Sequence, residues 1–423
     1  MPSIHATPVR QGSFEPAPSA PCTAQPASRW LGITVMALCA ALLNGPAFAA
    51  PFTPTSDSQV LETVPARASD PAAREMQALR QAWRAQPLDL DTAVRLGWRY
   101  QAEVAATGDP RYMGYIQAAL QPWWALPDPP DEVRVLRAVV LQFDHRFEPA
   151  LQDLAAVLQR NPDDARAAAW QLATRLVVAD YDGARDSCTR LAPRVSALVA
   201  SACAAQVDAS TGRAGPAAQA LRAALNRAGS ADGADTDERL WSLTRLAEIE
   251  ERLGQWAAAE ATFGQALALQ RPDVYLSAAH ADFLLDRGRA ADVLRHLQDR
   301  GRADVLLLRL ALAAKATGDV RAVAYQRELQ ARFDAARLRG DTSHLKEESR
   351  HALTLLGDVP LALRLARENW AEQKEPADAR TLLEAALAAR DKATAAPVLQ
   401  WMAASRIESV ALRSLAARVQ ALP

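Results

Sequence analysis

The stretch Leu136–Asp163, LRAVVLQFDHRFEPALQDLAAVLQRNPD, decides the fold that we expect for this chain. Its anchor residues follow one another at intervals of 12, 4, 3 and 5 positions: Ala138, Ala150, Leu154, Val157 and Pro162. Small residues at the first two anchors let two helices approach closely, and larger residues further on fill the gap to the next pair. A proline then ends the second helix. The stretch therefore predicts a closely packed pair of antiparallel helices.

The same spacing recurs along most of the chain. The 12-4-3 pattern returns at Ala205, Ala217, Leu221 and Ala224, then at Ala247, Ala259, Phe263 and Ala266, with Ala281, Val293 and Leu297 continuing the frame. Weaker units begin near residues 90, 165, 304, 344 and 378, and glycines lie near the expected turns within the pairs: Gly183, Gly212, Gly254, Gly288, Gly318 and Gly357. A recurring unit of this size is typical of a repeat protein.

These anchors resemble those of the tetratricopeptide repeat (TPR). The resemblance covers about residues 71–423 and implies an all-α fold, an α-solenoid of stacked antiparallel helix pairs that forms a TPR-like superhelix. In such a stack each repeat contacts its neighbours and the repeats share one elongated core.

Composition agrees with this expectation and excludes other classes. Half of the residues are hydrophobic and 23% are charged, which is too apolar for a disordered chain. The net charge of −1 argues against a nucleic-acid partner, because such proteins usually present a basic face.

Residues 1–49 are typical of a bacterial signal peptide. An apolar run at 31–43 precedes Ala47 and Ala49, which fit the small-residue pattern of a cleavage site. The run is too short to span a bilayer, which needs about 20 apolar residues. We therefore expect cleavage after Ala49, a periplasmic or secreted protein, and no membrane span in the mature chain.

The remaining chain divides at changes of pattern. We predict a flexible tether at 50–70, an atypical N-terminal helical cap at 71–130, repeats at 131–227, an inserted loop at 228–237, and repeats with a C-terminal cap at 238–423. Thr236 or Asp237 is expected to cap the helix after the loop. The loop is also the place where the stack could divide into two lobes.

Aromatic residues gather in the predicted N-terminal cap. They are Trp83, Trp98, Tyr100, Tyr112, Tyr115, Trp123 and Trp124. Their pattern fits either bulk that closes the end of the core or a recognition site for a partner.

Two cysteines, Cys188 and Cys203, remain after the signal peptide. Both fall in expected helices, and Pro193 marks the turn between them. Neighbouring antiparallel helices would bring the two thiols together, and an oxidising compartment favours a disulfide. Two buried free thiols are the alternative.

The sequence carries none of the strong catalytic or cofactor motifs, such as GxSxG, HExxH, a Walker loop, GxGxxG or CxxC. We therefore predict a protein that is not an enzyme and has no cofactor. The best metal-like set is His344, Glu348 and His351, which share one helical face. A complete site would need ligands from a facing helix, and a polar stripe is the simpler interpretation.

The TPR resemblance also implies a binding surface, because TPR arrays bind extended peptides or helices in a concave groove lined by the first helix of each pair. Carried over position by position, the groove residues are Trp98, Gln101, Gln142, Gln206, Glu248, Glu251 and Asp282. This set is polar and acidic and lacks the Lys/Arg cluster that some family members use to hold a terminal carboxylate. It favours a basic or neutral polar protein or peptide as the partner.

The leading functional prediction is thus an exported, non-catalytic scaffold for protein–protein interaction, in cell-envelope assembly, secretion or protein maturation. A periplasmic small-ligand or metal-binding helical protein and an enzyme with an unrecognised site are the alternatives. The sequence leaves the oligomeric state open.

Overall fold

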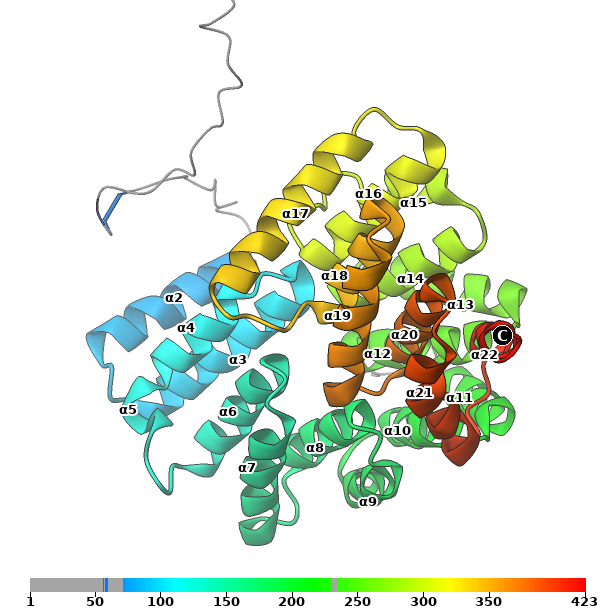
Figure 1. The fold of residues 1–423 in the computed structure, drawn as a ribbon. Helices are drawn as coiled ribbons and strands as arrows, with labels where there is room; N and C mark the ends of the chain where they lie inside the picture. Colours follow the sequence, from blue (N-terminus) through cyan, green and yellow to red (C-terminus); the bar gives the residue numbers. More distant parts are fainter. Residues whose placement is uncertain (1–55, 57, 60–70, 230–234) are drawn as a thin grey trace, which may run out of the picture. The chain divides into compact units, whose positions relative to one another are not determined.

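The computed structural model describes Ser56, residues 58–59, 71–229 and 235–423. The predicted signal peptide and nearly all of the predicted tether lie outside the described residues. Everything from Pro71 onward that is described consists of helices joined by short connections, without a β-strand (Figure 1).

The α-helices and their bounds are α2 (Pro71–Ala85), α3 (Leu90–Thr107), α4 (Arg111–Ala119), α5 (Gln121–Trp124), α6 (Asp131–Phe143), α7 (Phe147–Arg160), α8 (Ala165–Val177), α9 (Tyr181–Leu191), α10 (Ala197–Ser210), α11 (Ala214–Arg227), α12 (Thr236–Arg252), α13 (Trp256–Ala268), α14 (Val274–Asp286), α15 (Ala290–His296), α16 (Asp304–Thr317), α17 (Ala322–Leu338), α18 (Leu345–His351), α19 (Val359–Glu372), α20 (Pro376–Ala389), α21 (Lys392–Ser405) and α22 (Val410–Gln420). A 3₁₀ turn, η1 (Ala192–Arg194), follows α9, and a π-helical turn, η2 (Ala352–Leu356), follows α18.

Successive helices pack as pairs, in which we call the first member helix A and the second helix B. The pairs α6/α7, α10/α11 and α12/α13 coincide with the three units whose anchors the sequence identified. The alanine anchors are buried where the two helices of a pair meet, and Ala150, Ala247 and Ala259 have no exposed surface. The weaker units are also helix pairs that begin at α3, α8, α16, α18 and α20. The all-α solenoid and its TPR-like repeats are confirmed.

The turn between helix A and helix B needs a residue in the left-handed backbone region. Gly212 fills this role between α10 and α11 with φ +81°. It also has to be small, because a Cβ placed there would lie 3.0 Å from the Cβ of Arg406. Gly183 lies near the turn between α8 and α9, in the first turn of α9, but the left-handed conformation in that turn belongs to Ala179, with φ 61°.

The predicted inserted loop falls between the end of α11 at Arg227 and the start of α12 at Thr236, and residues 230–234 lie outside the described part. Asp235, rather than Thr236 or Asp237, caps α12, because its side chain accepts a hydrogen bond from the backbone N–H of Asp237. The helix therefore begins one residue earlier than a cap at Thr236 would allow and two residues earlier than a cap at Asp237 would.

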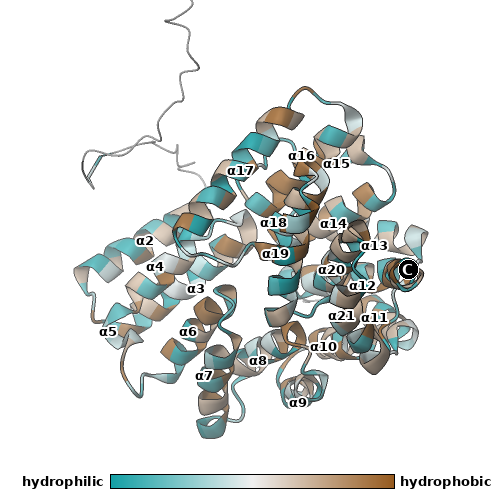
Figure 2. Cartoon of the chain, viewed as in Figure 1, coloured by the Kyte–Doolittle hydropathy of each residue, from teal (hydrophilic) through white to brown (hydrophobic). Residues whose placement is uncertain are grey.

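The buried apolar residues form clusters that succeed one another along the chain. Their members span residues 76–140, 135–207, 198–313, 307–355 and 352–419. Figure 2 shows hydrophobic and hydrophilic residues alternating around the helices, as expected where each helix has one buried face. Each cluster thus joins neighbouring repeats, which is the packing that a solenoid requires.

The helices from α3 to α16 follow a curve that returns to its beginning. A Cβ added to Gly108, just after α3, would lie 2.7 Å from the Cβ of Ala303, just before α16. The first and later repeats therefore touch, and Figure 1 shows α18, α19 and α20 within the area that this curve encloses.

Cys188 and Cys203 are bonded to each other. Cys188 lies in α9 and Cys203 in α10, and their Cα atoms are 5.8 Å apart. The bond joins helix B of one pair to helix A of the next.

We expect no reactive thiol in a chain that starts at Ala50 when it is denatured without reductant. We further expect Cys203→Ala to lower the free energy of unfolding by about 3 kcal/mol, because the bond closes a short loop in the unfolded chain. Thiol titration and urea denaturation measure the two effects. Two titratable thiols per unreduced chain would exclude the bond.

The close contact between paired helices also predicts that a larger side chain lowers stability on the buried side of α13 and not on its exposed side. Ala259→Leu inserts three carbons between α12 and α13 and should lower stability by about 1–3 kcal/mol. Ala257→Leu, on the exposed side of the same helix, is the matched control and should change stability by less than about 0.5 kcal/mol. Equal melting temperatures for the two variants would contradict the tight-contact interpretation.

Candidate functional site

The residues predicted to line the groove all lie on A helices. Trp98 and Gln101 are in α3, Gln142 in α6, Gln206 in α10, Glu248 and Glu251 in α12, and Asp282 in α14. The three acidic residues come together and interact electrostatically. The other four lie on earlier repeats, and among the described residues no hydrogen bond or ion pair joins them to the three acids. Trp98 instead packs under Arg166 of α8, whose guanidinium carbon lies 4.8 Å from the ring centroid.

Glu248 is held by two neighbours. The hydroxyl of Tyr275 donates a hydrogen bond to Glu248 at 2.5 Å, and Arg245 forms an ion pair with it at 3.1 Å. The guanidinium of Arg245 also stacks over the Tyr275 ring, 4.3 Å from its centroid. Desolvation by the neighbouring protein raises the pKa of Tyr275 although half of the residue's surface is exposed, and Arg245 opposes that rise only in part. The phenol therefore stays protonated and remains a hydrogen-bond donor.

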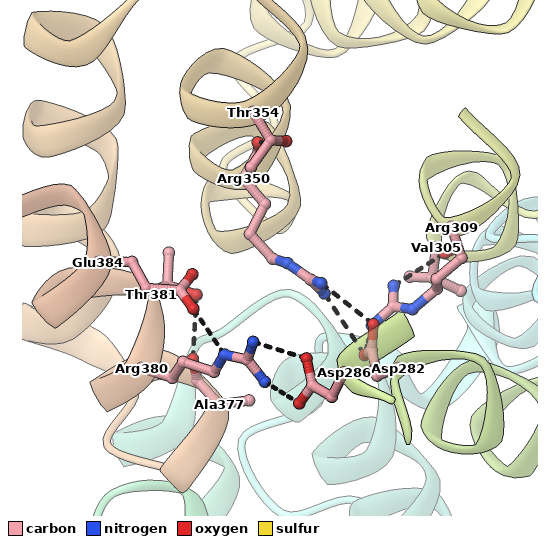
Figure 3. Close-up of polar contacts among 10 residues, drawn as sticks. All are labelled: Asp282, Asp286, Val305, Arg309, Arg350, Thr354, Ala377, Arg380, Thr381 and Glu384. Carbon is pink, nitrogen blue, oxygen red and sulfur yellow. Dashed lines mark hydrogen bonds and ion pairs between the residues drawn. The ribbon is translucent and has the colours of Figure 1, made fainter. Parts of the chain in front are cut away.

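Asp282 is the most heavily paired carboxylate of the group (Figure 3). Arg309 of α16 donates a hydrogen bond to it, and Arg350 of α18 donates a second one at 3.1 Å. Burial alone would raise the pKa of Asp282, but the two guanidinium groups lower it well below its ordinary value. Asp282 is thus a permanent anion that joins three helices.

Asp286, one turn further along α14, receives a two-pronged contact from Arg380 of α20 (Figure 3). One of these hydrogen bonds measures 2.8 Å, and Arg380 also donates to Glu384 at 2.7 Å. The paired geometry suits arginine, whose planar guanidinium presents two parallel donors to a carboxylate. This contact spans 94 positions in sequence and ties the C-terminal repeats to α14.

Glu251 differs from these acids because no cation is paired with it among the described residues. The pKa of Glu251 is raised to about 8, first by burial and then by the nearby carboxylates of Asp286, Glu248 and Asp282. We call Glu248, Glu251, Asp282 and Asp286 the inner carboxylates. At neutral pH, three of them are neutralised by arginine or tyrosine contacts and the fourth is largely protonated.

Sequence reasoning found three inner carboxylates and missed the fourth together with every cation. Asp286 stands four positions after Asp282, so helical periodicity could have added it. Arg309, Arg350 and Arg380 come from later repeats. Their approach follows from the closing of the superhelix, and no local pattern signals it.

The weak metal candidates lie elsewhere, at the α17–α18 junction. Glu348 forms an ion pair with Arg337 of α17, and the His351 ring packs edge-on against Phe333. Burial lowers the pKa of His351. Within the described ranges, no group of three or more His, Cys, Asp and Glu side chains is placed to hold a metal ion.

The helices of residues 71–229 and 235–423 include none with the length and apolarity needed to cross a membrane.

No family model matches this chain, and no curated protein matches it. Solved structures similar to it include a tetratricopeptide repeat protein from Parabacteroides merdae, which is 15% identical with a TM-score of 0.42, the match covering 57% of this chain and 92% of that one. The Cut9–Hcn1 hetero-tetramer of APC/C is 13% identical with a TM-score of 0.45, covering 82% of this chain and 66% of that one. A human IFIT1 dimer with m7Gppp-AAAA is 11% identical with a TM-score of 0.41, covering 79% and 86%. The class that the fold defines is a TPR-like α-solenoid, and the buried anchors and successive helix pairs of this chain carry that assignment.

Because Glu251 has a raised pKa and no paired cation among the described residues, we expect the stability of the folded chain to depend on pH. Between the ordinary pKa of a glutamate and about 8, the folded chain holds a proton that the unfolded chain has lost, so stability falls as pH rises through this interval. Glu251→Gln removes this loss and should raise the free energy of unfolding at pH 8.5 by more than about 1 kcal/mol, since each unit of pKa shift corresponds to about 1.4 kcal/mol. At pH 4.5 the gain should nearly vanish.

Urea denaturation at both pH values measures this effect. Glu132→Gln, which changes an exposed carboxylate of α6 far from Glu251 in the sequence, is the control and should leave the pH profile unchanged. A Glu251→Gln variant whose stability follows the wild-type pH profile would contradict the assignment.

Proposed function

We propose that this chain is an exported scaffold that binds a protein partner in the bacterial cell envelope and catalyses no reaction. The observation that carries the proposal is the curved array of helix pairs, in which the A helices α12 and α14 bring four carboxylates together. Because successive pairs stack along this curve, an extended peptide or a helix laid against it would contact several repeats at once. TPR-like arrays generally serve protein–protein interaction in this way.

Two features of the sequence support export. The apolar run at 31–43 followed by Ala47 and Ala49 is typical of a secretory leader. The bond between Cys188 and Cys203 suits an oxidising compartment, where disulfides form and persist.

The charges support a protein partner over a nucleic acid. The net charge of −1 gives the chain no excess of basic residues to attract phosphate groups. A partner that carries arginine would exchange ion pairs with the inner carboxylates in place of the arginines that hold them.

The proposal predicts that in-cell crosslinking of the tagged full chain will attach a specific envelope protein. The same tagged chain without residues 2–49 should remain in the cytoplasm and lose that crosslink. Mass spectrometry of the crosslinked product identifies the partner, and intact-mass analysis of the purified protein tests for an N-terminus at Ala50. Recovery of the same partners by both chains, or of none by the full chain, would count against the proposal.

A further inference from the structure

The last repeats of the chain cover the place where a groove partner would enter. Residues 345–423, which comprise α18–α22 and which we call the C-terminal lid, contact the A–B turns of earlier pairs one after another. The contacts involve His145 with Gln373, Val177 with Lys374, Tyr181 with Trp401, Ala214 with Glu408, and Gly254 with Val410. The lid thus follows the edge formed by four consecutive pairs, from α6/α7 to α12/α13.

Most of these contacts are polar. The backbone N–H of Lys374 donates to the carbonyl of Val177 at 2.8 Å, and the indole N–H of Trp401 donates to the Tyr181 hydroxyl at 3.1 Å. Arg350 and Arg380 add the ion pairs to Asp282 and Asp286 (Figure 3). Hydrogen bonds and ion pairs exchange readily with water or with another partner, so this joint differs from the apolar joints within the stack.

The lid also has a hydrophobic core of its own. The cluster at 352–419 draws its buried members from the lid alone. The cluster that joins the lid to α16 and α17 receives a single buried residue from the lid, Leu355, against Leu307, Phe333 and their neighbours. Movement of the lid would therefore leave intact the clusters at 198–313 and 352–419, and would open only the smaller cluster where Leu355 and His351 of the lid pack against Phe333. The segment that connects α17 to the lid, residues 339–344, contains Gly340 with φ +71°.

The lid neutralises the inner carboxylates incompletely. Arg350 and Arg380 pair with Asp282 and Asp286, while Glu251 forms no ion pair with the described residues of the lid and feels only the more distant charge of Arg380. Tyr275, beside Glu248, remains 52% exposed, so the lid does not seal this face. A helix that placed a cation within ion-pair distance of Glu251 would favour its ionised form and gain a contact that the lid does not make.

We propose that the C-terminal lid is a resident occupant of the inner face, and that the partner which replaces it presents arginine side chains on a helix. The proposal rests on the scaffold function proposed above and specifies its partner. In the free protein, Arg350 and Arg380 hold the lid on Asp282 and Asp286. When the partner arrives, its own arginines take over these carboxylates and the lid swings about residues 339–344.

The test compares the full-length wild type with the double variant Arg350→Ala/Arg380→Ala. A fluorescein-labelled synthetic peptide of residues 375–390, which contains Arg380, serves as the probe in anisotropy titrations. We expect the double variant to bind this peptide at least tenfold more tightly than the wild type, and small-angle scattering to give it a larger radius of gyration. A peptide carrying Arg380→Ala should bind the double variant at least tenfold more weakly.

The matched control is Arg364→Ala/Arg367→Ala, which removes two exposed arginines from α19 of the same lid. It should behave as the wild type does in both measurements, and circular dichroism verifies that every variant is folded. Equal peptide binding and equal radii of gyration for the wild type and the double variant would contradict the proposal that the lid occupies the inner face. Equal binding of the two peptides to the double variant would contradict the specificity for arginine.

These outcomes are separate from the fate of the scaffold proposal. An envelope partner that crosslinks equally to the wild type and the double variant would support the scaffold proposal and contradict the lid proposal. Peptide binding by the double variant, with no partner crosslinked in cells, would support the lid proposal and contradict the scaffold proposal.

Discussion

The close approach of two helices at an alanine anchor is the constraint on which the rest of this structure depends. Ala247 and Ala259 have no exposed surface in the pair α12/α13, and in the pair α6/α7 Ala150 has none and Ala138 only 1%. Because the helices of a pair lie so close, larger residues such as Phe263 are left to fill the space toward the next pair. This repeated difference in packing sets the angle between neighbouring pairs, and the summed angles close the curve from α3 to α16.

Closure has an electrostatic consequence that no single repeat contains. Once the chain has curved, carboxylates on α12 and α14 face the repeats that follow them, and burial makes an unpaired charge costly there. Asp282 and Asp286 are compensated by arginines from α16, α18 and α20, while Glu251 holds a proton instead. Ion pairs that stay partly exposed, as these do, add little net stability, but removing one partner leaves a carboxylate without its counter-ion. Their contribution here is to fix which surfaces meet.

The sequence predicted the fold to a large extent, because the anchors that define it are local. Spacing alone located the pairs at α6/α7, α10/α11 and α12/α13, and it placed Cys188 beside Cys203 across a helix turn. The local differences concern conformations that several residue types adopt, as where Ala179 replaces glycine in a left-handed turn and Asp235 caps α12. The cations that face Asp282 and Asp286 escaped prediction for another reason. They depend on the sum of small rotations over many repeats, which periodicity does not encode.

If the lid occupies the inner face, the apparent affinity for a partner depends on how often the lid is away. A partner must bind the open state, and its apparent affinity is reduced by the fraction of molecules in which the lid is away. The lid is also tethered, so its local concentration is high and a weak, polar contact suffices to keep it in place. A helix that merely resembles α20 would then compete poorly, whereas one that also supplied a cation to Glu251 would gain an interaction the lid cannot offer. Selectivity would thus come from the difference between partner and lid, and the incomplete pairing of Glu251 is the feature that makes this difference available.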